Sequence, residues 1–131
     1  MSREVIVMIG FPGSGKTTLA KEKSNEGYCR IDGDVLKTAK AMIKEAEKKI
    51  QTQSILFDCT GGTKKKRSEF IAFAKKQKVP VRAFWVQTSL EESMRRNQLR
   101  EKPVPPVALY VYKKHFEEPS LEEGFSEILS F

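Results

Sequence analysis

The stretch that decides the fold is Gly10-Phe11-Pro12-Gly13-Ser14-Gly15-Lys16-Thr17, which directly follows the apolar run Val5-Ile6-Val7-Met8-Ile9. It fits the phosphate-loop pattern G-x-x-x-x-G-K-[ST] at every fixed position. In such a loop, backbone N–H groups turn toward phosphate oxygens, the lysine reaches the β- and γ-phosphates, and the final hydroxyl faces Mg²⁺. A chance glycine-rich loop is the alternative, and the flanking strand and helix argue against it. We therefore expect ATP and Mg²⁺ as cofactors, with nucleotide contacts from Gly10, Pro12, Gly13, Ser14, Gly15, Lys16, Thr17 and Thr18.

Length and composition narrow the class of protein. At 131 residues the chain is large enough for one domain, 1–131, which must hold both the donor and the acceptor site. The 39% hydrophobic and 31% charged content is typical of a soluble globular protein, and no apolar stretch is long enough to span a bilayer. Residues 1–4 lead straight into the first strand without a secretory signal, so we expect an intracellular, cytoplasmic protein with no membrane partner. A nuclear or viral origin stays open.

Charge and cysteine usage give weaker indications. The net charge of +7 favours a polyanionic partner, although solvated lysine-rich helix faces would explain it equally well. Cys29 and Cys59 fall in or at the ends of predicted buried strands, which favours reduced packing residues over a disulfide.

Apolar runs alternate with amphipathic stretches along the chain, a pattern typical of a parallel sheet flanked by helices. Strands are expected at 4–9, 28–32, 54–58, 81–86 and 128–131, and helices at 16–24, 34–49, 64–77, 90–100 and 107–116. The prolines at 103, 105 and 106 separate the last two helices. The expected fold class is α/β, a P-loop NTPase three-layer sandwich with a central parallel sheet and a short arginine lid.

Acidic residues stand at the ends of two predicted strands, where ligands bind in open α/β sheets. Asp34 is placed to accept the proton of an attacking hydroxyl, and its alternative role is that of a helix N-cap. Asp58 is placed to orient Mg²⁺ together with Thr17, and its alternative role is to hold loop N–H groups. The run Asp32-Gly33-Asp34-Val35 also resembles a dehalogenase-type phosphatase motif, which we reject because the sheet is already committed to the phosphate loop.

Basic residues complete the candidate site. Arg96 and Arg100 share a helix face just before the prolines, where guanidinium groups would close over a triphosphate; the alternative is a basic helix end. The run Lys64-Lys65-Lys66-Arg67 stands at a helix N-terminus and opposes the helix dipole, which favours an anionic ligand there. The single histidine, His115, is interpreted as structural.

Taken together, these motifs resemble the kinase domain of polynucleotide 5′-hydroxyl kinases. The resemblance runs from Val5 to Phe131 and rests on the phosphate loop, Asp34-Val35-Leu36, Asp58-Cys59-Thr60, Arg96-Asn97-Gln98-Leu99-Arg100-Glu101, and the tail from Tyr110 to Phe125. The tail discriminates most, because it is similar to the end of the kinase domain in animal enzymes that heal nucleic-acid ends. Gly33, Cys59 and Pro106 depart from the family pattern, which affects the expected acceptor preference more than the expected kinase activity.

The resemblance implies a role for each matching residue. Asp34 would be the general base, Lys16 the γ-phosphate contact, and Arg96 and Arg100 the lid arginines. Thr17 would coordinate Mg²⁺, and Asp58 is its candidate partner. Lys37 would lie near the acceptor phosphate, and Arg67 also falls where the family has an arginine, although its role stays open. With Lys64 and Lys65 from the basic run, Lys37 and Arg67 make up the candidate acceptor-binding residues.

The expected function is transfer of the ATP γ-phosphoryl group to the 5′-hydroxyl of DNA or RNA in end repair. The partner would be nucleic acid with a 5′-hydroxyl end, with a separate phosphatase or ligase as a further partner, since any 3′-phosphatase would come from another chain. Two alternatives stay open. One is a kinase acting on a nucleoside, nucleotide or sugar, and the other is a nucleotide-gated module that binds nucleic acid.

Overall fold

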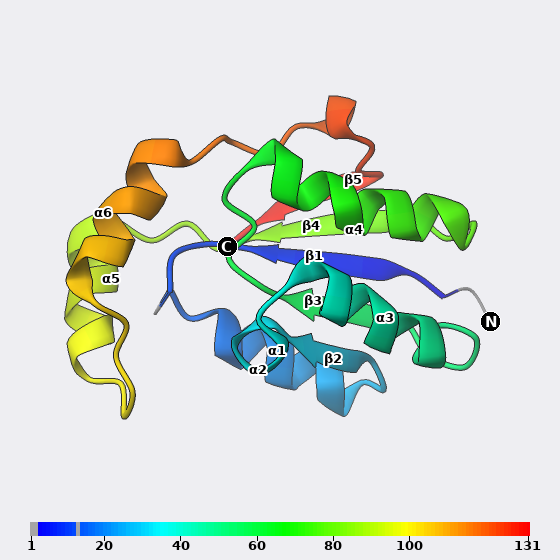
Figure 1. The fold of residues 1–131 in the computed structure, drawn as a ribbon, viewed down its shortest axis with the longest axis horizontal. Coiled ribbons are helices and arrows are strands. Elements are labelled where there is room, and N and C mark those ends of the chain that lie inside the picture. Colours follow the sequence, from blue (N-terminus) through cyan, green and yellow to red (C-terminus); the bar gives the residue numbers. More distant parts are fainter. Residues whose placement is uncertain (1–2, 13) are drawn as a thin grey trace.

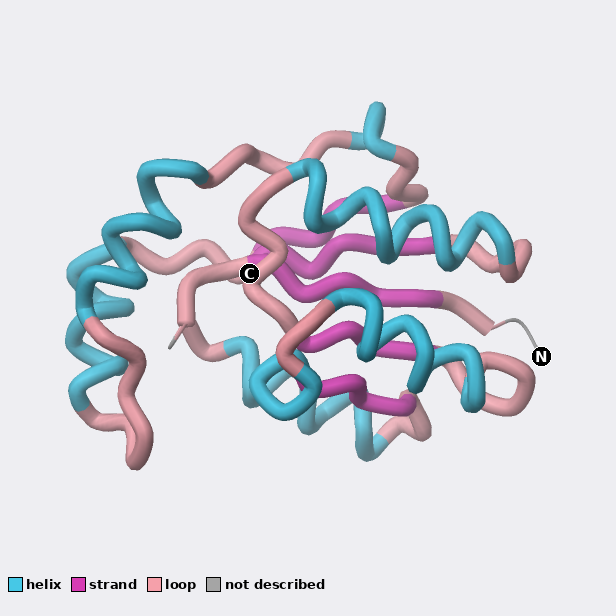
Figure 2. Tube along the Cα trace, in the orientation of Figure 1, coloured by secondary structure: helices cyan, strands magenta, loops and turns pink. Residues whose placement is uncertain are grey.

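A parallel five-stranded sheet forms the centre of the computed structural model, which describes residues 3–12 and 14–131 (Figures 1 and 2). The strands lie in the order β2-β3-β1-β4-β5, and every neighbouring pair is parallel. Their bounds are β1 Val5–Ile9, β2 Cys29–Asp32, β3 Ile55–Asp58, β4 Val81–Trp85 and β5 Glu127–Ser130. The chain order reverses on either side of β1, so the phosphate loop leaves the sheet at the switch point where α/β folds bind ligands.

Helices cover both faces of this sheet. Their bounds are α1 Lys16–Asn25, α2 Gly33–Leu36, α3 Ala39–Lys49, α4 Lys64–Lys76, α5 Leu90–Gln98 and α6 Pro106–His115, with a short 3-10 helix, η1, at Leu121–Glu123. Figure 1 shows α3 and α4 in front of the sheet and α1 behind it, while α5 and α6 stand beyond the carboxyl ends of the strands. Among the residues that the structure describes, no helix is long and apolar enough to cross a membrane.

The core explains why β1 is apolar at every position. All five β1 side chains are fully buried, because a central parallel strand is covered on both faces. Val5, Val7 and Ile9 pack toward the layer of α3 and α4, whereas Ile6 and Met8 pack toward Ala20 of α1. The predicted three-layer arrangement is therefore confirmed.

Both cysteines are free, and burial raises the pKa of Cys59 to about 12, which keeps its thiol protonated.

One predicted helix is wrong. The stretch 34–49 is divided into α2 and α3, because Lys37 adopts a left-handed backbone with φ 70° and Thr38 is extended. The Thr38 hydroxyl then accepts a hydrogen bond of 3.1 Å from the backbone N–H of Ala41 and starts α3 afresh. Val35, on the short helix α2, is 71% exposed.

The lid consists of α5, α6 and the loop between them. The buried Asn97 holds this loop from both sides: its side-chain amide donates to the Val104 carbonyl at 2.8 Å and accepts from the Val104 N–H at 3.0 Å. The Ser89 hydroxyl caps α5 by accepting a 3.1 Å hydrogen bond from the backbone N–H of Glu92. Pro106 begins α6, where the missing N–H needs no partner.

Candidate active site

A cavity of about 580 Å³ opens at the carboxyl ends of β1, β2 and β3. Residues from the phosphate loop, α2, the end of β3 and the lid line it together. They include Gly15, Lys16, Thr17, Asp34, Lys37, Asp58, Arg96 and Arg100. The structure thus brings the predicted phosphate-binding, acidic and lid residues into one space.

Two glycines give the phosphate loop its shape. Gly15 has φ 96°, and a Cβ there would lie 3.0 Å from Nη1 of Arg96, so the lid arginine lies against the loop. A Cβ at Gly10 would lie 2.8 Å from the Ser14 hydroxyl and 2.9 Å from the Val86 carbonyl. A side chain therefore has no room at Gly10, and at Gly15 it is disfavoured by the positive φ.

The loop residues fit a phosphate ligand. The Ser14 hydroxyl is buried and has no hydrogen-bond partner among the described residues, so it has a donor to offer. Lys16 Nζ donates to the carbonyls of Gly10 and Phe11, at 3.0 and 2.8 Å. Burial lowers the pKa of Lys16 to about 8, and the nearby Asp58 charge opposes this effect. An anion in the cavity would favour the charged ammonium in the same way.

Other predicted nucleotide contacts are placed less directly. Pro12 lines the cavity, and Thr18 contacts the loop through a 3.3 Å bond from its N–H to the Gly15 carbonyl. Gly13 lies outside the described residues.

Asp34 is free for chemistry because a neighbouring residue caps its helix. The Asp32 carboxylate accepts a 2.9 Å hydrogen bond from the backbone N–H of Asp34, so Asp32 is the N-cap of α2. The Asp34 side chain is 84% exposed and lines the cavity, with Oδ2 at 3.7 Å from Nη2 of Arg100. The alternative in which Asp34 is merely a cap is therefore excluded.

The two lid arginines reach the cavity from successive turns of α5 and its end. Arg96 Nε donates to Glu92 Oε1 at 2.9 Å, which orients the guanidinium toward the phosphate loop. Glu92 also accepts from Arg95, and these hydrogen bonds lower the pKa of Glu92 to about 2. Arg100 is one turn further along and faces Asp34.

Asp58 has a partner that the sequence did not indicate. Its Oδ2 accepts from Nε and Nη2 of Arg30 on β2, at 2.8 and 2.5 Å, rather than from loop N–H groups. Arg30 thus holds the carboxylate at the cavity floor. Within the described part of the chain, no group of three or more His, Cys, Asp or Glu side chains would hold a metal. A magnesium ion at Thr17 and Asp58 would therefore need oxygen ligands from a bound nucleotide, as is usual for this ion.

The predicted acceptor-binding lysines separate into two groups. Lys37 lines the cavity, whereas Lys64 and Lys65 are exposed and lie outside its lining. Lys66, which belongs to the basic run that the sequence predicts to meet an anion, lines the cavity together with Phe70. Lys37 and Lys66 therefore add positive charge to the cavity beyond that of Lys16 and the lid arginines.

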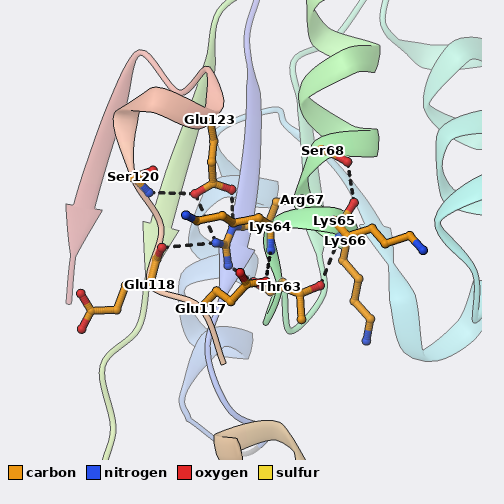
Figure 3. Close-up of polar contacts among 11 residues, drawn as sticks. Thr63, Lys64, Lys65, Lys66, Arg67, Ser68, Glu117, Glu118, Ser120 and Glu123 are labelled. Carbon is orange, nitrogen blue, oxygen red and sulfur yellow. Dashed lines mark hydrogen bonds and ion pairs between the residues drawn. The ribbon is translucent and has the colours of Figure 1, made fainter. Parts of the chain in front are cut away.

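The prediction that Arg67 binds acceptor is wrong, because its side chain is fully buried. Figure 3 shows it reaching the C-terminal segment, where Glu123 accepts from Nε at 2.8 Å and from Nη2 at 3.2 Å. The remaining donors go to the Gly61 carbonyl at 2.7 Å and the Glu118 carbonyl at 3.4 Å. Arg67 is a structural tie between α4 and the tail.

A carboxylate of the chain itself lies at the N-terminus of α4. The Glu117 carboxylate accepts a 3.1 Å hydrogen bond from the backbone N–H of Lys64, and the Thr63 hydroxyl accepts from that of Lys66 (Figure 3). The expected anionic ligand at this helix end is thus replaced by a side chain of the chain itself.

Known proteins share this architecture and sequence. A protein family described as the AAA domain matches residues 5–55 and 38–119. The chain belongs to this AAA-domain family. It is also 34% identical over 133 residues to the bifunctional polynucleotide phosphatase/kinase of Schizosaccharomyces pombe, covering 96% of this chain and 33% of that protein. This confirms the resemblance seen in the sequence, although the chain spans only about a third of that relative's length.

Solved structures of other proteins have the same fold as this chain. Chaetomium thermophilum Kti12 in complex with ADP-AlF3 superposes with a TM-score of 0.80 at 19% identity, covering 97% of this chain and 88% of that one. A gluconokinase from Sinorhizobium meliloti 1021 superposes with a TM-score of 0.66 at 16% identity, covering 97% and 81%. At these identities the similarity concerns the P-loop fold.

Proposed function

We propose that this AAA-domain chain is an ATP-dependent kinase domain that transfers the γ-phosphoryl group to the 5′-hydroxyl end of DNA or RNA. The observation that carries the proposal is the shared cavity, which is lined by the phosphate loop, the exposed Asp34 carboxylate with its Arg100 partner, and the second lid arginine, Arg96. A nucleotide switch needs the loop alone. An acceptor base beside it favours transfer.

Each residue would act through position and charge. Lys16, Arg96 and Arg100 would surround the phosphoryl group and neutralise charge that develops on its oxygens. Asp34 would accept the proton of the attacking hydroxyl, and the adjacent Arg100 would hold that carboxylate toward the phosphate loop. Magnesium bound with ATP, held by Thr17 and Asp58, would supply further positive charge at the phosphates.

The acceptor side of the cavity suits the end of a strand. Lys37 and Lys66 provide positive charge for a backbone phosphate, while Met42 and Phe70 provide apolar surface for a sugar or base. Lys64 and Lys65 continue the positive charge along the surface outside the cavity. The similarity to a polynucleotide phosphatase/kinase supports the same acceptor.

The test is a transfer assay with γ-labelled ATP, Mg²⁺ and a panel of acceptors: 5′-hydroxyl DNA, 5′-hydroxyl RNA, mononucleotides and sugars. We expect label in the oligonucleotides. Label confined to small molecules would favour a small-molecule kinase, and ATP hydrolysis without transfer to any acceptor would favour a nucleotide-gated module.

A further inference from the structure

The loop Thr60–Gly62, which joins β3 to α4, is held through its backbone carbonyls. The Thr60 carbonyl accepts from the N–H of Gly10 at 3.0 Å and from the Tyr112 hydroxyl at 2.7 Å. The Gly61 carbonyl accepts from buried Arg67 at 2.7 Å, and the Gly62 carbonyl accepts from the N–H of Glu117 at 2.9 Å. Thr60 and Gly61 also line the cavity. A wall of the site is therefore anchored by α6, α4 and the tail.

The same loop is confined by close packing. Gly61 has φ 52°, and a Cβ there would lie 2.9 Å from the Met8 carbonyl on β1. A Cβ at Gly62 would lie 2.6 Å from the ring of Tyr112. The loop is thus packed tightly between β1 and this ring, so a shift of Tyr112 would displace the loop backbone.

Tyr112 reaches the phosphate loop by two routes. Its ring packs against the Phe11 ring in a tilted arrangement, with the ring centroids 4.9 Å apart and the planes at 54°. Its hydroxyl shares the Thr60 carbonyl with Gly10, the first residue of the phosphate loop. Burial raises the pKa of Tyr112, so the hydroxyl stays protonated and remains a donor at neutral pH.

We propose that Tyr112 is a positioning residue that holds the phosphate loop in its nucleotide-binding shape, through Phe11 on one side and the Thr60 carbonyl on the other. The inference rests on the proposed nucleotide binding by that loop. It gives α6 a part in nucleotide binding, although Tyr112 itself does not line the cavity that contains Asp34 and the lid arginines. The competing explanation is that Tyr112 only packs α6 onto the sheet.

The test compares Tyr112→Phe with Tyr110→Phe. Each change removes one hydroxyl from α6 and keeps the ring, but Tyr110 is 55% exposed and serves as the matched control. The dissociation constant of a fluorescent ATP analogue with Mg²⁺ is measured well below the melting temperature, which is recorded for each variant. Loss of one buried hydrogen bond should weaken binding about three- to tenfold in Tyr112→Phe and leave Tyr110→Phe at the wild-type value.

A second variant changes the Phe11 side of the contact between Phe11 and Tyr112. Phe11→Leu keeps the Tyr112 hydroxyl bond but removes the aromatic ring that packs against Tyr112, and it should also weaken nucleotide binding. A Tyr112→Phe variant that melts earlier yet binds nucleotide like the wild type would overturn the positioning role. If the wild-type chain itself bound no nucleotide, the proposed function would fail first, and this inference with it.

Discussion

Removing the buried Arg67 guanidinium is expected to cost the fold a large part of its stability. In Arg67→Met the Glu123 carboxylate, whose side chain is only 9% exposed, loses both arginine bonds and keeps the Ser120 N–H as a donor. Breaking one partner of a buried ion pair costs about 3–5 kcal/mol, because the other charge is left uncompensated. Since whole domains are stable by only about 5–15 kcal/mol, the variant should lose about a fifth or more of its free energy of unfolding.

Urea denaturation, followed by the fluorescence of the single tryptophan, Trp85, measures this loss. The urea concentration at the midpoint of unfolding should fall, while the slope of the free energy of unfolding against urea concentration (the m-value) stays unchanged. Adding Glu123→Gln should recover part of the loss, because it removes the orphaned charge and keeps an oxygen for Ser120. Lys48→Met, which breaks an exposed pair with Glu45, is the control and should leave the midpoint almost unchanged. A loss below about 1 kcal/mol in Arg67→Met, the scale of a surface pair, would refute the reasoning.

Three further predictions concern the cavity. Asp34→Asn should reduce phosphoryl transfer about a hundredfold or more while nucleotide affinity stays near the wild-type value, as measured by single-turnover kinetics and a binding titration. Lys66→Ala should lower the salt dependence of single-stranded acceptor binding by about 0.7 in the log–log slope, whereas Lys65→Ala, outside the cavity, should change it less. Nucleotide affinity should fall as the pH rises through about 8, because Lys16 loses its proton there, and a flat profile to pH 10 would contradict the lowered pKa.

Sequence alone predicts most of the sheet, and most plainly β1 and β3, which are short apolar runs that end in a glycine-rich loop and an acidic residue. The division between α2 and α3 could not be predicted in the same way. The apolar spacing continues through it, and the left-handed backbone of Lys37 is imposed by the surrounding structure rather than by a glycine. Thr38, a good N-cap residue, was the one local signal.

The site shows the same division between local and long-range information. The phosphate loop, Asp34 and the lid arginines carry local patterns, and the structure places them together. The bonds from Arg30 to Asp58 and from Arg67 to Glu123 join residues 28 and 56 positions apart, which one sequence does not reveal. The burial of Arg67, however, could have been predicted from the helical spacing of the residues around it.

That signal lies in the spacing of α4. Arg67 precedes the buried Phe70, Ile71 and Ala74 by three, four and seven residues, so it belongs to the inward face of the helix. The basic run around it obscured this periodicity. A charged residue on an apolar face predicts a buried partner, and Glu123 is that partner.

The most direct test of the central claim uses two oligonucleotides of one sequence that differ only at the 5′ end, one carrying a hydroxyl and the other a phosphate. Each is incubated with γ-labelled ATP and Mg²⁺, with the wild-type chain and with Asp34→Asn. The account predicts label at the 5′ end of the hydroxyl strand alone, and its loss by about a hundredfold in the variant. Equal labelling of both strands, or no labelling of either by a chain that binds ATP, would contradict it.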